Sequence, residues 1–282
     1  MTGLMTAGVR VLDDRDAGAA QEVLDADPVG NVFVAARIRT AGFEYARLGA
    51  QVWGYSDSGS IESLCYWGAN LIPVSATPAA AAAFAAQAAR QGRVCSSILG
   101  RHEAVEIIWA GVRAAWTPAR DVRPAQPLLV TSAMPAVAAD AAVRRVQLSE
   151  LDALMPACVA MYTEEVGVSP VGPDGGAAYR SRVTEMVVCG HSYARIEDGE
   201  VLFKAEIGAV TPQICQVQGV WVTPRLRGRG LGTAGIAAVV ADALGTVAPA
   251  VSLYVNAHNL PARRAYERVG FTSAGTFMSV LF

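Results

Sequence analysis

Residues 219–233 combine residue types that can bind a phosphate. They read Gly-Val-Trp-Val-Thr-Pro-Arg-Leu-Arg-Gly-Arg-Gly-Leu-Gly-Thr, which predicts a short buried strand, a proline stop and a glycine-rich loop. From Thr233 to Leu244 the bulkier apolar residues recur every three or four positions, which predicts a helix. The first N–H groups of a helix lack internal acceptors and carry the positive end of its dipole. The stretch therefore predicts a site for a phosphate or pyrophosphate, and the three arginines add positive charge.

Two common phosphate-binding motifs do not fit this loop. A P-loop places Gly-Lys-Ser/Thr at the helix start, whereas the corresponding run here is Gly230-Leu231-Gly232-Thr233, without a lysine. A dinucleotide-binding fold places an acidic residue at the end of the next strand, whereas residues 251–255 lead into Asn256. Both readings are therefore disfavoured.

A second motif follows between residues 259 and 271. Asn259, Ala262 and Tyr266 are three and then four positions apart, so one face of a helix presents all three. Asn259 suits the N-cap, and a proline in the first turn loses no hydrogen bond that the helix needs. Gly270 followed by Phe271 is typical of a helix C-cap with an apolar contact.

The two motifs together resemble the Gcn5-related N-acetyltransferases (GNAT). That family has Arg/Gln-x-x-Gly-x-Gly/Ala between a strand ending in Val-x-Pro and a helix. Its second signature is Asn-x-x-Ala-x-x-x-Tyr-x-x-x-Gly-Phe. The resemblance covers roughly the second half of the chain, from about residue 143 onward. The matching residues are Val222, Pro224, Arg227, Gly230 and Gly232 for the first signature, and Asn259, Ala262, Tyr266, Gly270 and Phe271 for the second.

The resemblance implies acetyl-CoA as co-substrate and assigns residues to it. The pyrophosphate would lie on the loop amides, and the pantetheine arm between the strands at 220–222 and 251–255. A main-chain N–H near Val220 or Val222 would polarise the thioester carbonyl, Asn259 would contact the pantetheine or phosphate arm, and Tyr266 would protonate the leaving thiolate. The implied cofactor-binding set is Val220, Trp221, Val222, Arg225, Arg227, Gly228, Arg229, Gly230, Leu231, Gly232, Thr233, Asn259, Ala262 and Tyr266.

The general base is not evident where many relatives have a glutamate, on the strand before the loop. Gln216 and Gln218 stand there, and an amide cannot take a proton from an ammonium group. Deprotonating a lysine-like amine at neutral pH costs roughly 4.6 kcal/mol and an α-amine about 1 kcal/mol, so a weakly basic acceptor is favoured. The candidate bases elsewhere are Glu164, Glu165 and Glu206, each of which has a solvated carboxylate as its alternative reading.

Composition limits the class of protein. The chain has 282 residues, of which 52% are hydrophobic and 17% charged, which indicates a well-cored globular protein. A net charge of −2 gives no general attraction to nucleic acid or membranes, and the Arg-Leu-Arg-Gly-Arg-Gly run lacks the interleaved aromatic residues of an RNA-binding or DNA-binding segment. We find neither an export signal nor a membrane span, so we expect a cytoplasmic protein.

The cysteines and histidines indicate no metal site. Five cysteines, an odd number, lack Cys-x-x-Cys spacing and have mostly apolar neighbours, as expected of reduced core thiols. The three histidines are scattered among unrelated segments. We therefore expect no metal and no Ser-His-Asp arrangement.

The order of predicted elements repeats along the chain. The first half reads as strand 9–12, helices 13–24 and 32–40, a hairpin of 51–55 and 61–66 around Asp57-Ser58-Gly59, strand 71–74, helix 78–90, strand 94–99 and helix 102–114. The second half reads as strand 143–147, helices 150–165 and 176–188, hairpin strands 192–196 and 201–210, strand 213–222, helix 233–244, strand 251–255, helix 261–269 and a closing strand or hairpin in 271–282. Between them, residues 120–142 predict a proline-rich crossing segment with one strand at 128–131.

This repetition predicts a duplicated α/β (α+β) domain. We expect two tandem GNAT-like domains, each a mixed, mostly antiparallel sheet flanked by helices. The boundaries are 1–125 for a degenerate N-terminal domain, 126–142 for a linker or crossing strand, and 143–282 for the acetyltransferase domain. Ser-Ala-Thr-Pro stands at 75–78 in place of the glycine loop, so the first copy has lost its phosphate site.

The sequence therefore predicts an acyl-CoA-dependent N-acyltransferase that works by direct attack in a ternary complex. We expect a small-molecule or peptide amine as acceptor, no nucleic-acid or membrane partner, and a possible homodimer. The alternative is a catalytically silent acyl-CoA-binding sensor, because no general base is evident and the first copy lacks the loop.

Overall fold

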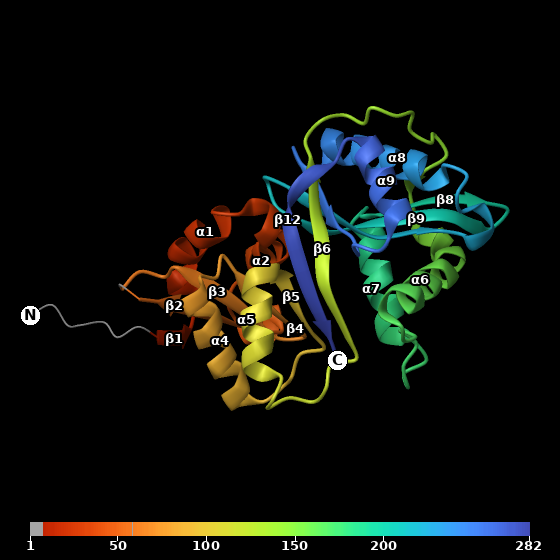
Figure 1. The fold of residues 1–282 in the computed structure, drawn as a ribbon. Coiled ribbons are helices and arrows are strands. Elements are labelled where there is room, and N and C mark those ends of the chain that lie inside the picture. The colour runs from red at the N-terminus through yellow and green to blue at the C-terminus, as the bar shows by residue number, and fades with distance from the viewer. Residues whose placement is uncertain (1–7, 58) are drawn as a thin grey trace, which may run out of the picture. The chain divides into compact units, whose positions relative to one another are not determined.

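The structure is a computed structural model that describes residues 8–57 and 59–282, so Ser58 of the predicted turn lies outside the described residues. Contacts divide the chain into two compact units (Figure 1). The first unit contains the described part of residues 1–128 together with 254–257 and 273–282. The second contains residues 129–253 and 258–272. The last strand of the chain therefore belongs to the first unit.

The first unit has a sheet flanked by helices. Its strand order is β1 (Gly8–Val11), β2 (Gln51–Ser56), β3 (Ser63–Trp67), β4 (Asn70–Val74), β5 (Ser97–Arg101), β12 (Thr272–Leu281) and then β6 (Asp121–Thr131). Pairing is antiparallel from β1 to β4 and between β5 and β12, and parallel between β4 and β5. The helices are α1 (Ala17–Asp25), α2 (Pro28–Ala41), α3 (Tyr45–Leu48), α4 (Pro78–Gln91) and α5 (His102–Val112).

Both faces of this first sheet are buried. Successive side chains of a strand point to opposite faces, and on β2 Val52 joins a core with α1 and α2 whereas Trp53 joins a core with α4 and α5. Leu64 and Cys65 on β3 divide in the same way. Burial on both sides explains why these strands read as continuous apolar runs rather than as alternating ones.

The second unit repeats the arrangement. Its strand order is β11 (Val251–Tyr254), β10 (Cys215–Val222), β9 (Glu200–Val210), β8 (Ser192–Glu197) and β7 (Arg144–Arg145), antiparallel except for β10 and β11. Figure 1 shows α6 (Leu151–Val166) and α7 (Ala177–Val188) on one face of this sheet, with α8 (Leu231–Thr246) and α9 (Leu260–Val269) on the other. The predicted fold class, a mixed and mostly antiparallel arrangement of strands flanked by helices in each unit, is confirmed.

The repeat extends to individual ion pairs. Arg10 forms a two-bond ion pair with Asp16, six residues on, and Arg144 forms the same pair with Glu150. In each unit the acidic partner also closes a capping box around a single 3₁₀ turn, at Asp14–Asp16 and at Leu148–Glu150. The same device at the same point of each unit supports duplication.

Several predicted bounds differ from the structure. The strand predicted at 94–99 is β5 at Ser97–Arg101, and the helix predicted at 13–24 is a 3₁₀ turn followed by α1. The helix predicted at 32–40 begins earlier, because Asp27 caps it and Pro28 occupies its first turn. The short helix α3 was not predicted.

The crossing segment also differs from its prediction. It contains the 11-residue strand β6, in which the main-chain oxygen of Pro127 accepts a hydrogen bond from the N–H of Val255. Proline lacks a donor but keeps its acceptor, so the strand tolerates it. The final strand β12 pairs with β5, and residues 273–282 belong to the first unit. The predicted boundaries instead divide the chain once, at 126–142, and they stay a prediction.

Candidate active site

The strand β10 leaves part of its main-chain edge unpaired. Its parallel pairing with β11 covers only Cys215 with Val251 and Gln216 with Ser252. In the described part of the chain, Val217, Gln218, Trp221 and Val222 pair with β9 alone. The N–H groups of that free edge, and its C=O groups other than that of Val222, which accepts from Arg227, are therefore available to an extended ligand.

A β-bulge lies in the same part of β10. Gln218 pairs with Glu206 and Trp221 with Lys204, so three residue steps on β10 face two on β9. Gly219 sits in the bulge with φ of 59°, in the left-handed region that glycine adopts without steric cost. Gly219 and Val220 consequently have no register partner among the described residues of β9.

The loop after β10 opens directly onto α8 without a cap. A 3₁₀ turn covers Pro224–Leu226, and Gly228 and Gly230 follow with φ of 75° and 87°. Gly230 is the N-cap and offers no side-chain acceptor, and the first helical bond runs from Ala234 to Gly230. Among the described residues no acceptor reaches the N–H groups of residues 231–233. The start of α8 is thus suited to an anion, as the sequence predicts.

The loop arginines are mostly engaged by carboxylates. Arg227 donates to Glu164 at 2.7 Å and to the main-chain oxygen of Val222 at 2.9 Å. Arg225 pairs with Glu200 at 2.5 Å. Arg229 is exposed, and within the described residues no hydrogen bond or ion pair involves it. Arg229 is therefore the loop arginine that can meet a phosphate without first releasing a carboxylate.

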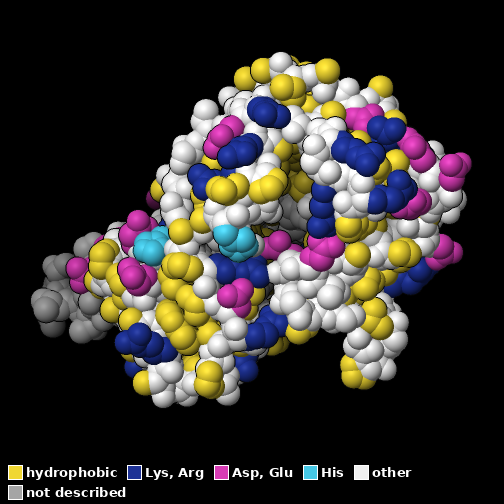
Figure 2. All heavy atoms as spheres, turned by 45° about the vertical axis from the view of Figure 1, so that its right-hand side comes forward, with side chains coloured by type: hydrophobic (Ala, Val, Ile, Leu, Met, Phe, Trp, Pro, Cys, Tyr) yellow, Lys and Arg dark blue, Asp and Glu magenta, His cyan; other side chains and the backbone are white. Residues whose placement is uncertain are grey.

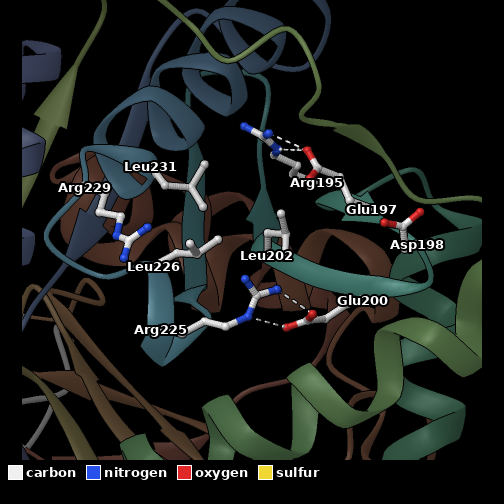
Figure 3. A pocket seen from close by; sticks show the side chains of 9 residues that line it. All are labelled: Arg195, Glu197, Asp198, Glu200, Leu202, Arg225, Leu226, Arg229 and Leu231. Carbon is white, nitrogen blue, oxygen red and sulfur yellow. Dashed lines mark hydrogen bonds and ion pairs between the residues drawn. The ribbon is translucent and has the colours of Figure 1, made fainter.

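A cavity of about 530 Å³ lies beside this loop, at the turn between β8 and β9 (Figure 3). Figure 3 shows two ion pairs in its wall, Arg225 with Glu200 and Arg195 with Glu197. On the face that Figure 2 shows, Lys and Arg side chains likewise lie among Asp and Glu. The lining residues are Arg195, Glu197, Asp198, Glu200, Leu202, Arg225, Leu226, Arg229 and Leu231.

The second motif folds as its spacing predicts. The side chain of Asn259 accepts a hydrogen bond from the N–H of Ala262 at 3.2 Å and caps α9. Gly270 ends the helix with φ of 113°, and the ring of Phe271 packs edge-on against Tyr266 at 5.9 Å. Ala262 lies on the same helix, one turn after the cap. Tyr266 is buried, with 6% of its surface exposed.

Burial decides the protonation state of Tyr266. Loss of water around the hydroxyl raises its pKa above the ordinary value of 10, and the nearby charge of Glu165 raises it further. A hydroxyl whose pKa lies above that of a thiol can protonate a leaving thiolate only in a transfer concerted with cleavage of the C–S bond. Tyr266 is therefore a hydroxyl donor at neutral pH.

The three candidate carboxylates lie in different surroundings. Glu164 is held by Arg227 and by the indole N–H of Trp221 at 3.1 Å. Glu165 is close enough to raise the pKa of Tyr266. Glu206 is buried on β9 and accepts a hydrogen bond from Lys204 at 2.5 Å. The structure thus brings Glu165 near Tyr266 and Glu206 near the bulge, whereas Glu164 belongs to an ion pair.

Lys204 is buried beside Gly219 of the bulge, and the sequence analysis gave it no role. The signal was present in Val-Leu-Phe-Lys-Ala-Glu-Ile at 201–207, where a lysine and a glutamate two positions apart interrupt an apolar strand on one face. Gln218 is also explained, because its side chain lies over Gly208, where a Cβ would come within 2.3 Å of its oxygen.

Comparison with known proteins shows which families parts of this chain resemble. Residues 177–271 match the model of the Acetyltransferase (GNAT) family, and residues 50–154 match one described as a domain of unknown function, DUF4081. Mycothiol acetyltransferase of Mycobacterium leprae is 40% identical over 73 residues, which is 24% of this chain and 24% of that protein. The chain thus matches about a quarter of the length of these curated relatives.

Solved structures share the whole fold. A Drosophila protein has a TM-score of 0.68 at 14% identity, covering 98% of this chain and 99% of its own. A GCN5-related N-acetyltransferase from Sphaerobacter thermophilus has a TM-score of 0.55 at 14% sequence identity, and the match covers 97% of this chain and 94% of that one. A tandem GNAT protein from the clavulanic acid biosynthesis pathway has a TM-score of 0.51 at 12% sequence identity, and the match covers 97% of this chain and 98% of that one.

Two further findings concern membranes and metals. In the described part of the chain, none of the helices combines the length and the apolar character needed to cross a bilayer. Within the same residues, no group of three or more His, Cys, Asp or Glu side chains is arranged to hold a metal ion. All five cysteines are free thiols.

Proposed function

Because the C-terminal half of the chain carries a domain of the GNAT acetyltransferase family, we propose that the protein is an N-acetyltransferase that uses acetyl-CoA or a short acyl-CoA. The observation that carries this proposal is the uncapped start of α8 directly after the half-unpaired strand β10. These two features offer unpaired N–H groups for a diphosphate and an open strand edge for an extended arm. The acyl thioester supplies the activated acetyl group.

The residues that would hold the co-substrate fit its chemistry. The N–H groups of residues 231–233 suit the pyrophosphate, and Arg229 adds an available charge. The free edge of Val220–Val222 suits the amide-bearing pantetheine arm, and the bulge offers an N–H to the thioester carbonyl. We propose the remaining loop residues, with Asn259 and Ala262, as the wall of the same site.

Tyr266 is our proposed proton donor. Its raised pKa keeps the hydroxyl protonated, so it can give a proton to sulfur as the C–S bond breaks. The acceptor nitrogen forms the new C–N bond and loses a proton, which returns to Tyr266 in place of the proton given to sulfur as the C–S bond breaks. A carboxylate among Glu164, Glu165 and Glu206 takes the proton that an ammonium acceptor must first release.

We propose an amine of a small molecule or peptide as the acceptor, in a cytoplasmic setting where free thiols persist. The curated relatives are named mycothiol acetyltransferases, and their match supports acetyl transfer but spans too little of the chain to assign their acceptor here. The absence of a carboxylate on β10 favours weakly basic amines.

The test is a panel of amines with acetyl-CoA, followed by release of free thiol, alongside calorimetric titration of acetyl-CoA. We expect saturable binding and turnover of at least one weakly basic amine. Binding without turnover of any amine would instead favour the acyl-CoA sensor. No binding of acetyl-CoA would contradict both readings.

A further inference from the structure

The second unit contains a buried ion pair that, within the described residues, makes no hydrogen bond to the glycine-rich loop before α8 or to α9. Lys204 is the only lysine of the chain, and its side chain is fully buried on β9. Its Nζ donates to Glu206 Oε1 at 2.5 Å, and Glu206 is 7% exposed. Removing two charges from water is costly, and apolar residues of similar volume often serve stability as well. Stability alone therefore does not account for the buried pair.

The pair lies directly under the bulge of β10. A Cβ built on Gly219 would come within 3.2 Å of Lys204 Nζ and 3.4 Å of Glu206 Oε2. It would also meet Met161 Cε of α6 at 3.1 Å. Glycine at the bulge is thus required twice, by its φ and by the ion pair beneath it. The bulge is also where the proposed function places the thioester.

The two oxygens of Glu206 differ. Oε1 accepts from Lys204 Nζ and lies 3.8 Å from the thiol of Cys158. Among the described residues no hydrogen bond reaches Oε2, the oxygen on the side of Gly219. The carboxylate is therefore anchored by one oxygen and offers the other toward the bulge.

The surroundings of Glu206 leave Lys204 as its charged neighbour. Burial raises the pKa of the Cys158 thiol on α6 to about 11. Burial also raises the pKa of Tyr179 on α7, whose hydroxyl donates to the main-chain oxygen of Cys158 at 3.0 Å. Both groups are neutral at physiological pH. Among the groups of β9, α6 and α7 that interact with Glu206, the ammonium of Lys204 is the charged one.

We propose that Lys204 is a positioning residue that fixes Glu206 by Oε1, so that Oε2 takes the proton released by the acceptor ammonium at the bulge. This inference rests on the proposed function and deepens it, because it selects one base among three. Glu164 is already bound to Arg227 and Trp221. The transfer balances, since the ammonium loses one proton, Oε2 gains it, and the nitrogen lone pair becomes free to attack the thioester carbon.

Kinetics of matched variants test the roles. Glu206→Gln keeps the shape but cannot accept the proton, and we expect kcat to fall about 100-fold with the acetyl-CoA Kd within about twofold. Lys204→Met should lower kcat about 10-fold with the acetyl-CoA Kd within about twofold, because the carboxylate loses the hydrogen bond that anchors Oε1. The control Glu185→Gln, an exposed carboxylate on α7, should leave kcat within about twofold.

A second measurement does not depend on turnover or on the stability of Lys204→Met. Because the chain has one lysine, labelling with ¹⁵N-lysine gives one side-chain signal. We expect that Nζ signal to shift in Glu206→Gln and, in the parent, on addition of acetyl-CoA.

Several outcomes would overturn the inference. Turnover of Glu206→Gln close to that of the parent would show that Glu206 is not the base. An Nζ signal at the same chemical shift in Glu206→Gln and in the parent would show that Lys204 does not position Glu206. A folded Lys204→Met with the parent's kcat would also remove the positioning role. If the parent binds acetyl-CoA but acetylates no amine, the proposed function and this inference fail together, whereas an active parent with an active Glu206→Gln defeats the inference alone.

Discussion

The loop between β4 and α4 and the loop between β10 and α8 occupy the same position in the two units. Each follows a strand whose parallel pairing covers two residues, Asn70 and Leu71 in one and Cys215 and Gln216 in the other. In the first unit Thr77 caps the helix by accepting from the N–H of Ala80 at 3.2 Å. In the second unit no side chain caps the helix.

The first loop is further tied to its own sheet. Ser63 Oγ donates to the main-chain oxygen of Ser75 at 3.0 Å and accepts from the N–H of Thr77 at 3.3 Å. A Cβ on Gly100 of β5 would come within 3.3 Å of Pro73 on β4, so those strands stay in contact beyond their pairing. In the first unit, side chains of the unit itself bond to the main chain of the loop and the helix start. In the second unit no side chain of the described residues caps the helix, so its first N–H groups stay unpaired.

The helices that follow the next strand differ in the same sense. Tyr266 is the seventh residue after the N-cap Asn259, and Ile108 is the seventh after the N-cap Arg101. The first unit therefore has an apolar side chain where the second has a hydroxyl. A duplicated fold can keep its core while losing each polar group that serves a ligand.

The largest expected effect comes from making the second unit resemble the first at Tyr266. Tyr266→Phe removes the proton donor and keeps the packing, so we expect kcat to fall about 1,000-fold while the acetyl-CoA Kd stays within about twofold. Steady-state kinetics and calorimetry measure the two quantities. Turnover close to that of the parent would show that another group protonates the thiolate.

A carboxylate in the second loop should close it to anions. We expect Gly230→Asp to weaken acetyl-CoA binding about 100-fold, through repulsion of the diphosphate and strain at φ of 87°. Gly230→Asn carries the same strain without the charge, so the difference between the two variants isolates electrostatics. Calorimetry measures both, and circular dichroism checks the fold.

Equal affinities of Gly230→Asp and Gly230→Asn would contradict the phosphate assignment. Gly49→Asp provides a control in the first unit, because Gly49 also has a left-handed φ, of 70°, and open space around its Cβ. We expect that variant to bind acetyl-CoA like the parent.

Removing a cap from each unit should separate stability from binding. Thr77→Ala and Asn259→Ala should each lower the free energy of unfolding by about 1 kcal/mol. Only Asn259→Ala should also weaken acetyl-CoA binding, because α9 belongs to the proposed site. Denaturant titration gives the stability, and a loss of affinity in Thr77→Ala would assign a ligand role to the first loop.

The smallest effect concerns the duplicated ion pairs. The Arg144 guanidinium lowers the pKa of Glu150 to about 2 from an ordinary value of 4.5. A lowered pKa means that the stabilisation is present above about 4.5 and is lost as pH falls through about 2. In Glu150→Gln we expect the free energy of unfolding to fall less steeply as pH is lowered through this range. The difference from the parent should be less than about 1 kcal/mol, since the pair is largely solvated. An unchanged slope would assign the acid sensitivity elsewhere.

Local signals made much of the fold predictable from sequence. The caps at Asn259 and Gly270 and the glycines at 228 and 230 are set by neighbouring residues, so their spacing was sufficient. The pairing of β12 with β5 joins residues far apart in the chain, and no local pattern encodes it. The loop arginines are similar, since their partners Glu164 and Glu200 come from distant elements.

The pairing of β5 with the final strand has a consequence for synthesis. During translation β5 emerges long before β12, so one side of it lacks its partner while the whole second unit is being made. An open strand edge is a site of mispairing between nascent chains. Co-translational folding of the first unit is therefore expected to stop short of its final sheet, and expression of residues 1–125 alone should yield an aggregating fragment.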